Sequence, residues 1–288
     1  KRVAELRAFL GGFDASAYGA GFVAMLNSAQ TKLDQMSSIR NSISALQISA
    51  RDAIGYYTDL NGTFLGLIDE ATRLTANGEV TRMLGAYSYF LQSKERAGQE
   101  RAVLSNAFAA NQFAPGLFRR FGELVAAQDT YLRAFRSLAT EDAISFYDDK
   151  MRDASVGQVN KMRDVAFERA ATGNFGIDSG VWFQTITTKI NLEKDIEDHL
   201  AKTLIARVEA LETEANTGLV SFSLIAAIST LLAMVLGFMI SRNITGSLNA
   251  TLAALDDIAE GEGDLTRRLT VSGRDEVARL AEAFNRFA

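Results

Sequence analysis

The apolar and polar positions along residues 1–215 follow the period of long helices. Apolar residues recur at helical spacing, and the two-residue alternation of a half-buried strand is scarce. Breaks are expected where glycine, proline or asparagine cluster, namely at residues 11–12, 19–21, 77–78, 113–116 and 171–180. The pattern predicts an all-α region built from stacked bundles of long helices.

One stretch has a different pattern, because no charge occurs between Ala215 and Ser241. Its centre, residues 218–240, reads GLVSFSLIAAISTLLAMVLGFMI. At about 1.5 Å per residue this helix spans roughly 35 Å, which is enough to cross a bilayer core of about 30 Å. A core helix of a soluble protein rarely runs so far without a polar stripe. We expect one transmembrane helix here, continuous with a helix over residues 181–215.

The charges on either side of the apolar stretch indicate its orientation. Acidic residues precede it, whereas Arg242 follows it at once. Because positive charge favours the cytoplasmic side, residues 1–215 are expected outside the cytoplasm and residues 243–288 inside it. An outer domain needs an earlier signal or membrane anchor, and the sequence starts at Lys1 without Met. We therefore expect a further segment upstream.

Beyond the apolar stretch, two short segments have the pattern of a parallel coiled coil. The first repeats with 4-3-4-3 spacing at Ile244, Leu248, Thr251, Leu255 and Ile258. Glycines then interrupt the helix, and the second repeats with 3-4-3 spacing at Val277, Leu280, Phe284 and Phe287. Helices this short cannot bury such seams alone. A parallel four-helix bundle in a homodimer is expected.

Composition narrows the chemistry. The net charge is −5, so the basic face typical of nucleic-acid binders is lacking, and without Cys no thiolate can bind metal or act as a nucleophile. The single His199 has Asp195 at i−4, which predicts an ion pair, because a zinc site uses three or four ligands. We expect no enzymatic activity, no catalytic residue, no metal and no cofactor. The single proline, Pro115, fits long helices and is expected in the first turn of one.

The densest cluster of charges reads KERAGQER and begins at Lys94. On a helix Lys94, Gly98 and Arg101 share one face. A small anion can reach the backbone at Gly98 between the two cations, and a guanidinium suits a planar oxyanion. The alternative is a solvated face on which Glu95 and Glu100 pair with the cations. Spacing alone favours this alternative.

Two segments after the apolar stretch resemble the HAMP domain, the signal relay of bacterial transmembrane receptors. They are GDLTRRL at residues 263–269 and GRDEVARLAEAFN at residues 273–285. The chain departs from the family at Gly246, where a proline is common. The resemblance implies that residues 241–288 form a parallel coiled-coil bundle in a dimer.

Three segments of the outer region look like the NIT domain, the nitrate- and nitrite-sensing module of bacterial receptors. They are GYYTDLN at residues 55–61, FLQSKERAGQERA at residues 90–102 and WFQTITTKI at residues 182–190. The resemblance implies stacked helical bundles that bind nitrate or nitrite between helices, with arginines as the principal ligands. Carried over to this sequence, the candidate ligand-binding residues are Arg101, Lys94, Gly98, Trp182, Thr185 and Lys189. The family's early Gln-x-Glu-Arg-Gly motif does not occur here and is expected upstream.

Taken together, the sequence predicts a bacterial inner-membrane receptor of the methyl-accepting chemotaxis type. Residues 1–215 are its periplasmic sensor, residues 218–240 lie in membrane lipid, and residues 241–288 relay the signal. The expected partners are nitrate or nitrite, a second copy of the chain, and a cytoplasmic signalling module with a chemotaxis kinase and adaptor. Two alternatives stay open. One is a receptor for an amino acid, an organic acid or a binding protein, and the other is a membrane scaffold without a ligand.

Overall fold

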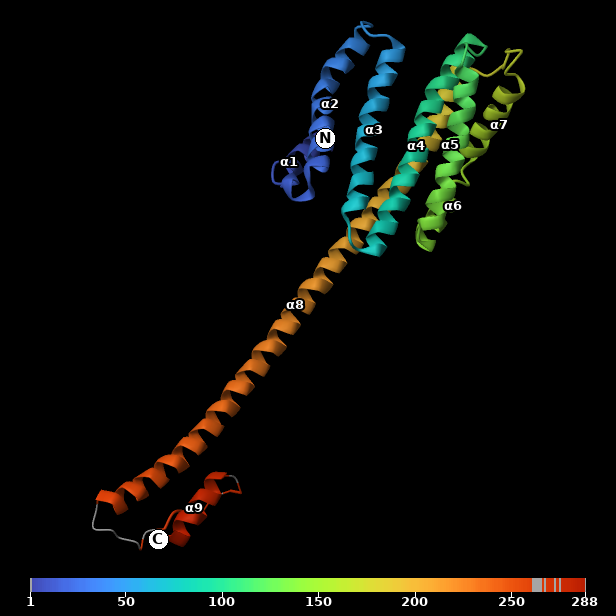
Figure 1. The fold of residues 1–288 in the computed structure, drawn as a ribbon. Coiled ribbons are helices and arrows are strands. Elements are labelled where there is room, and N and C mark those ends of the chain that lie inside the picture. Colours follow the sequence, from blue (N-terminus) through green and yellow to red (C-terminus); the bar gives the residue numbers. More distant parts are fainter. Residues whose placement is uncertain (1, 261–265, 267, 272, 275, 288) are drawn as a thin grey trace. The chain divides into compact units, whose positions relative to one another are not determined.

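The computed structural model describes residues 2–260, 266, 268–271, 273–274 and 276–287 (Figure 1). Within these ranges every regular element is a helix, which confirms the all-α prediction. The elements are α1 (Arg2–Leu10), the 3-10 helix η1 (Ala15–Tyr18), α2 (Ala20–Ser44), α3 (Ala50–Leu74), α4 (Gly78–Ala110), α5 (Leu117–Leu138), α6 (Glu141–Lys150), α7 (Ala154–Glu168), α8 (Ser179–Glu260) and α9 (Glu276–Phe287). The chain forms two compact units, residues 1–210 and 211–288.

Each of the five breaks predicted from glycine, proline and asparagine coincides with a boundary between helices, although three of the predicted ranges extend into the first residues of the next helix. Three further breaks, before α3, α6 and α7, contain neither glycine nor proline and were not predicted. Each is marked instead by an N-cap, in which a side-chain oxygen accepts a hydrogen bond from the first turn. The caps are Ser49, Thr140 and Asp153, which accept from the backbone N–H of Asp52 (3.1 Å), Ala143 (3.3 Å) and Ser155 (2.8 Å).

The prediction for Pro115 is wrong, because this residue lies in the turn before α5 and not in its first helical turn. The N-cap of α5 is Gly116, with φ at 82°. A positive φ is readily adopted only by glycine, so the chain passes through Gly116 before the helix begins.

In the first unit α4, α5 and α8 pack with α6 and α7, which follow one another as the fourth member of a bundle (Figure 1). Two clusters of buried side chains fill it. One surrounds the fully buried Trp182, whose ring meets Phe108 edge-on with centroids 5.6 Å apart. The other is built on Phe90 and Phe135, 5.4 Å apart. The bundle therefore holds α4 and α8 at fixed positions.

A charged network is buried among the helices of this bundle. Arg163 of α7 donates from Nε and Nη2 to the two carboxylate oxygens of Glu100 on α4, both at 2.6 Å. Gln128 of α5 donates to the same carboxylate at 2.8 Å. Burial acts to lower the pKa of Arg163, but the hydrogen bonds to Glu100 and the nearby negative charges together outweigh this effect and raise the pKa. Glu100 thus pairs across the bundle and not with its sequence neighbours.

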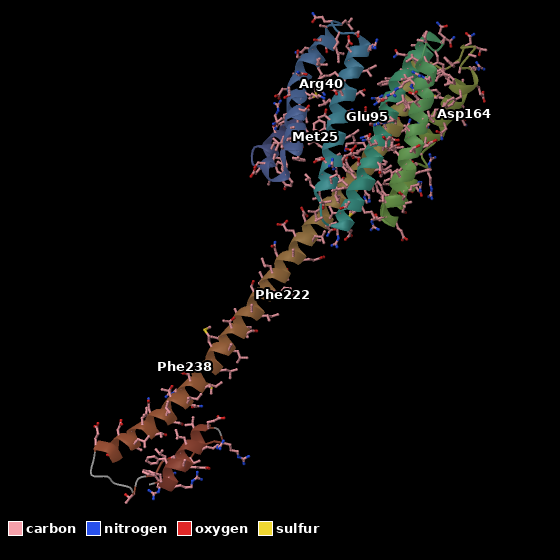
Figure 2. All side chains as sticks on the ribbon, viewed as in Figure 1. Met25, Arg40, Glu95, Asp164, Phe222 and Phe238 are labelled. Carbon is pink, nitrogen blue, oxygen red and sulfur yellow. The ribbon has the colours of Figure 1, made fainter. Side chains whose placement is uncertain are left out.

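Helix α8 is unbroken from Ser179 to Glu260, so the expected continuity of the outer helix with the apolar stretch is confirmed. Among the described residues it is the one helix long and apolar enough to cross a membrane. The apolar side chains of residues 218–240 are exposed, among them Phe222 (74%) and Phe238 (67%), which are labelled in Figure 2. A surface of this kind is unfavourable in water and suits a lipid environment.

In the second unit α9 packs through Ala278, Ala281 and Phe284, which are buried. The side chain of Asn285 fixes the preceding segment, because it accepts from the N–H of Leu269 (2.7 Å) and donates to its carbonyl (2.8 Å). Of the predicted seam positions, Thr251 and Phe284 are buried and Val277 is half-buried. The exposed seam positions are Ile244, Leu248, Leu255, Leu280 and Phe287. The side chain of Ile258 and residues 263–265 and 267 of the GDLTRRL motif lie outside the described residues.

The buried network predicts the effect of removing Arg163. Arg163→Met leaves the Glu100 carboxylate buried without its counterion, which should lower the free energy of unfolding by about 3–5 kcal/mol. The single Trp182, inside the same bundle, reports the transition by fluorescence in a denaturant titration. Arg136→Met is the matched control, because it breaks a more exposed pair with Asp148 and should cost less than about 1 kcal/mol. Equal losses of unfolding free energy in the two variants would contradict the conclusion that the Arg163–Glu100 pair is buried and stabilises the bundle.

Candidate functional site

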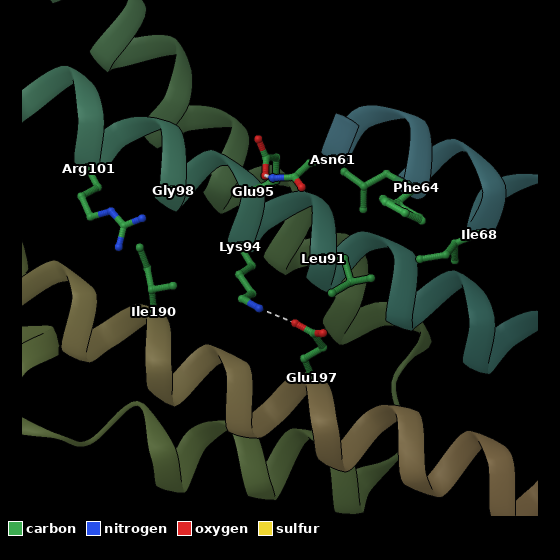
Figure 3. A pocket seen from close by; sticks show the side chains of 11 residues that line it. Asn61, Phe64, Ile68, Leu91, Lys94, Glu95, Gly98, Arg101, Ile190 and Glu197 are labelled. Carbon is green, nitrogen blue, oxygen red and sulfur yellow. Dashed lines mark hydrogen bonds and ion pairs between the residues drawn. The ribbon is translucent and has the colours of Figure 1, made fainter. Parts of the chain in front are cut away.

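A cavity of about 370 Å³ lies between α3, α4 and α8 (Figure 3). At about 30 Å³ per water molecule it has room for roughly a dozen waters. Helices α3 and α4 supply most of its apolar wall, and α4 and α8 supply most of its charges. The lining residues are Asn61, Phe64, Leu65, Ile68, Leu91, Lys94, Glu95, Gly98, Arg101, Ile190 and Glu197. The structure thus brings together Lys94, Gly98 and Arg101, as their helical spacing predicted.

Arg101 projects from α4 toward α8 (Figure 3). Its Nη1 donates to the hydroxyl of Thr187 at 3.0 Å, and its guanidinium carbon lies 4.9 Å from the centre of the Phe183 ring. Its backbone carbonyl accepts from the indole N–H of Trp182 at 3.1 Å. Among the described residues none offers this guanidinium a carboxylate at ion-pair distance. Burial lowers the pKa of Arg101, and its head group lies half-buried in the cavity without a counterion.

Lys94 lies two turns before Arg101 on α4 and forms an ion pair with Glu197 of α8 (Figure 3). A carboxylate oxygen of Glu197 also lies 3.3 Å from the ammonium nitrogen of Lys194 on its own helix. The expectation that Glu95 or Glu100 neutralises Lys94 is therefore wrong. The partner comes from another helix, which no local spacing on α4 reveals.

The two glutamates of the KERAGQER run have other partners. Glu95 lines the cavity and accepts from Asn61 at 2.8 Å and from Gln99 at 2.9 Å. Glu100 faces the bundle interior and binds Arg163. The solvated face laced with local ion pairs, which spacing alone favoured, is not what the structure has.

Gly98 lies between the two cations, and its surface faces open space. A Cβ built on Gly98 would meet no atom within 4 Å. Neither a close helix contact nor a special backbone conformation requires glycine here, although glycine inside a helix costs about 0.8–1 kcal/mol relative to alanine. The missing side chain exposes the α4 backbone to the cavity.

The other three candidates do not line the cavity. Trp182 fills the bundle core, and the hydroxyl of Thr185 donates to the carbonyl of Val181 at 2.8 Å. Lys189 is buried and pairs with Glu193 at 2.7 Å. Their role in ligand binding stays a prediction. Trp182 contacts the cavity residue Arg101 through the hydrogen bond from its indole N–H to the Arg101 backbone carbonyl.

Sequence reasoning missed the residues of α8 that do meet the cavity or Arg101, namely Phe183, Thr187, Ile190 and Glu197. Their spacing of four, three and seven residues places them on one helical face. Trp182, Ile186, Lys189 and Glu193 repeat in the same way on the buried face. The helical spacing of residues 182–197 was therefore a signal from which the buried face and the cavity face of α8 could have been predicted.

His199 lies beside an aspartate of another helix and not beside Asp195 of its own helix. His199 Nε2 lies 2.9 Å from a carboxylate oxygen of Asp142, and its ring stacks on Phe146 with centroids 4.2 Å apart. Asp195 instead accepts from Lys150 at 2.7 Å. Within the described residues, no group of three or more potential metal ligands lies together.

Comparison with known proteins places this geometry in context. Residues 1–205 match the NIT family, described as nitrate and nitrite sensing, and residues 239–288 match the HAMP domain. The nitrate regulatory protein of Klebsiella oxytoca is 26% identical over 180 residues, which are 62% of this chain and 45% of that protein. The methyl-accepting chemotaxis protein CtpM of Pseudomonas aeruginosa is 35% identical over 106 residues, which are 37% of this chain and 18% of that protein. These matches span less than half of either relative.

Among solved structures, the NasR transcription antiterminator is similar with a TM-score of 0.64 and 22% identity. The match covers 72% of this chain and 55% of that one. At this identity the similarity concerns the fold alone.

The open space at Gly98 predicts a gain in stability on substitution. Gly98→Ala should raise the free energy of unfolding by up to about 1 kcal/mol, because it removes a helix-interior glycine without a clash. Gly85→Ala on the same helix is the control, since its Cβ would lie 2.9 Å from the Leu138 side chain, and its gain should be smaller. Denaturant titration followed by Trp182 fluorescence measures both. Destabilisation by Gly98→Ala would show that the site is packed and not open.

Proposed function

Because this chain belongs to the nitrate- and nitrite-sensing NIT family, and because a HAMP domain follows its apolar helix, we propose that it is a chemotaxis receptor for nitrate or nitrite. The family and the methyl-accepting chemotaxis relatives identify a sensor and signal transducer. The anion, its site and the topology are the proposal. In support of the ligand, one relative is named a nitrate regulatory protein.

The observation that carries the proposal is the guanidinium of Arg101, which has no carboxylate at ion-pair distance in the part of the chain that the structure describes. A half-buried cation without a carboxylate has lost part of its hydration, and Thr187 and Phe183 compensate for this loss only in part, so an anion that enters the cavity gains a strong partner. Phe183 and Thr187 hold the planar head group on one side and leave its other N–H groups free to bind two oxygens at once. Nitrate and nitrite are planar and carry one charge, so they fit a single guanidinium beside Gly98.

The topology follows from the apolar stretch and its flanking charges. Residues 218–240 cross the bacterial inner membrane, and Arg242 lies on the cytoplasmic side. Residues 1–215 are then periplasmic, and residues 243–288 are cytoplasmic. The relay passes its signal to a cytoplasmic signalling module, which acts on a chemotaxis kinase and adaptor. The similarity of this chain to methyl-accepting chemotaxis proteins supports an output of this kind.

Signal transfer uses the continuity of α8. The same helix offers Thr187 and Glu197 to the site and continues to Glu260 in the relay. An anion can bias the output only through a difference in its affinity for two states of the receptor. Drawing α4 and α8 together at the cavity, or releasing them, shifts α8 slightly, and an unkinked helix passes such a shift along its length.

A second candidate ligand is a small organic carboxylate. The observation in its favour is that the cavity already contains a carboxylate on a cation, since Glu197 pairs with Lys94. Titration with formate or acetate beside nitrate and nitrite distinguishes the two classes.

The first prediction concerns Arg101. Calorimetry of the full chain in lipid nanodiscs should show nitrate or nitrite binding, and Arg101→Ala should weaken it by roughly ten- to hundredfold, the equivalent of one charge-assisted hydrogen bond at about 1.5–3 kcal/mol. Arg96→Ala is the control, because Arg96 hydrogen-bonds Gln92 and lies over Tyr131, outside the cavity. Undiminished binding by Arg101→Ala would refute the site. No heat with either anion would refute the ligand.

The second prediction concerns the homodimer. The chain has no cysteine, so a single Cys can be placed in the exposed relay seam without interference. Leu248→Cys or Leu255→Cys should crosslink in membranes under mild oxidation, because seam residues of a parallel pair face their copies. Ala253→Cys, on the opposite side of the helix, should not. Equal crosslinking at all three positions would contradict a parallel seam.

A further inference from the structure

We propose that Glu197 is a built-in competitor of the ligand. Its carboxylate holds Lys94, and an anion bound at Arg101 displaces it, so the bound anion and the Lys94–Glu197 ion pair exclude one another. This inference rests on the proposed function, because it assigns the residue that sets the affinity of the same site.

Lys94 and Arg101 are too far apart along α4 for one small anion to contact both unless one of the two side chains moves. Lys94 and Arg101 are seven residues apart, which is about 10.5 Å along the axis of α4. Figure 3 shows the Lys94 ammonium turned to Glu197 and the Arg101 guanidinium beside Ile190, so one small anion contacts both head groups only if one of them moves. The cavity between them, beside Gly98, is open.

The contacts on each cation indicate which one moves. Arg101 is fixed by the Phe183 ring, the Thr187 hydroxyl and the Trp182 indole on its carbonyl. Lys94 is held by the Glu197 carboxylate. A lysine ammonium is a point charge on a flexible four-carbon stem, and it accepts an oxyanion in any direction. Lys94 therefore turns to the ligand, and Arg101 stays in place.

When the ligand binds, Lys94 exchanges one planar, singly charged anion for another. A carboxylate, nitrite and nitrate each present two oxygens of a planar group with one negative charge, so Lys94 trades one for another at nearly equal cost. Glu197 keeps a partner when Lys94 leaves, because the Lys194 ammonium lies 3.3 Å from its other oxygen. The side chains of Lys94 and Glu197 are 20% and 19% exposed, so water reaches the pair and weakens it.

The consequence concerns both affinity and signal. Glu197 belongs to α8 and Lys94 to α4, so the ion pair ties together the two helices that form the charged wall of the cavity. Binding of the anion removes this tie. Breaking the Lys94–Glu197 ion pair costs free energy, so the anion binds less tightly than it would without the pair. Glu197 therefore sets the affinity without contacting the ligand.

The test compares dissociation constants of nitrate and nitrite for the full chain in nanodiscs. Glu197→Gln should tighten binding by roughly three- to tenfold, because Lys94 is released without the loss of a partly exposed ion pair. Asp195→Asn is the matched control, since Asp195 lies on the same helix and pairs with Lys150, outside the cavity. It removes the same charge and should leave the dissociation constants unchanged.

A double variant shows whether the effect passes through Lys94. Lys94→Met should weaken binding, and Lys94→Met with Glu197→Gln should bind no tighter than Lys94→Met alone, because the released cation is missing. Equal tightening by Glu197→Gln in both backgrounds would overturn the inference, since it would report a general loss of negative charge.

The outcomes also separate the inference from the function on which it rests. An unchanged affinity in Glu197→Gln, together with lost binding in Arg101→Ala, would overturn the role of Glu197 and leave the receptor function intact. Absence of binding in the unmodified chain would overturn both. Trp182 fluorescence during unfolding shows that each variant is folded.

Discussion

One electrostatic constraint underlies the proposed site: the half-buried guanidinium of Arg101 has no carboxylate partner among the described residues. A cation in this position has lost part of its hydration, and only the Thr187 hydroxyl and the face of Phe183 compensate for it within the described structure. Two features of the fold keep it there. The bundle core around Trp182 fixes the backbone of Arg101, and the open surface of Gly98 leaves room for an anion beside it. The site is therefore arranged for a charge that the protein does not supply.

Three other cations of the bundle differ from Arg101, because each of them has a carboxylate partner. Arg163 has Glu100 and Lys189 has Glu193, and both pairs are buried between helices or within one. Lys94 has Glu197, in a pair that water still reaches. The cations therefore differ in how strongly a carboxylate holds them. Arg163 and Lys189 have buried ion pairs, and Lys94 has a pair that water reaches. Arg101 has no ion pair among the described residues. Stability and the proposed ligand binding therefore depend on different residues, because the Glu100–Arg163 pair holds the bundle together and the Arg101 guanidinium has no carboxylate partner among the described residues.

Much of this architecture is encoded locally and can be predicted. The helical period, the uncharged stretch at 218–240 and the relay seams depend on neighbouring residues, and they were predicted correctly as helices. Breaks without glycine were missed because their signal is a single capping oxygen, as at Ser49 and Thr140. The face shared by Lys94 and Arg101 is also local. The partner of Lys94 is not, because Glu197 lies about a hundred residues later and only the packing of α8 on α4 brings the two together.

The central claim is that a planar anion binds Arg101 and takes Lys94 from Glu197. A structure of the full chain with nitrate, determined in a lipid nanodisc at a resolution that places side chains, tests it most directly. We expect nitrate density against the Arg101 guanidinium beside Gly98, with the Lys94 ammonium turned toward the anion and the Glu197 carboxylate left on Lys194. Density at another place in the bundle, or nitrate at Arg101 with the Lys94–Glu197 pair intact, would contradict it.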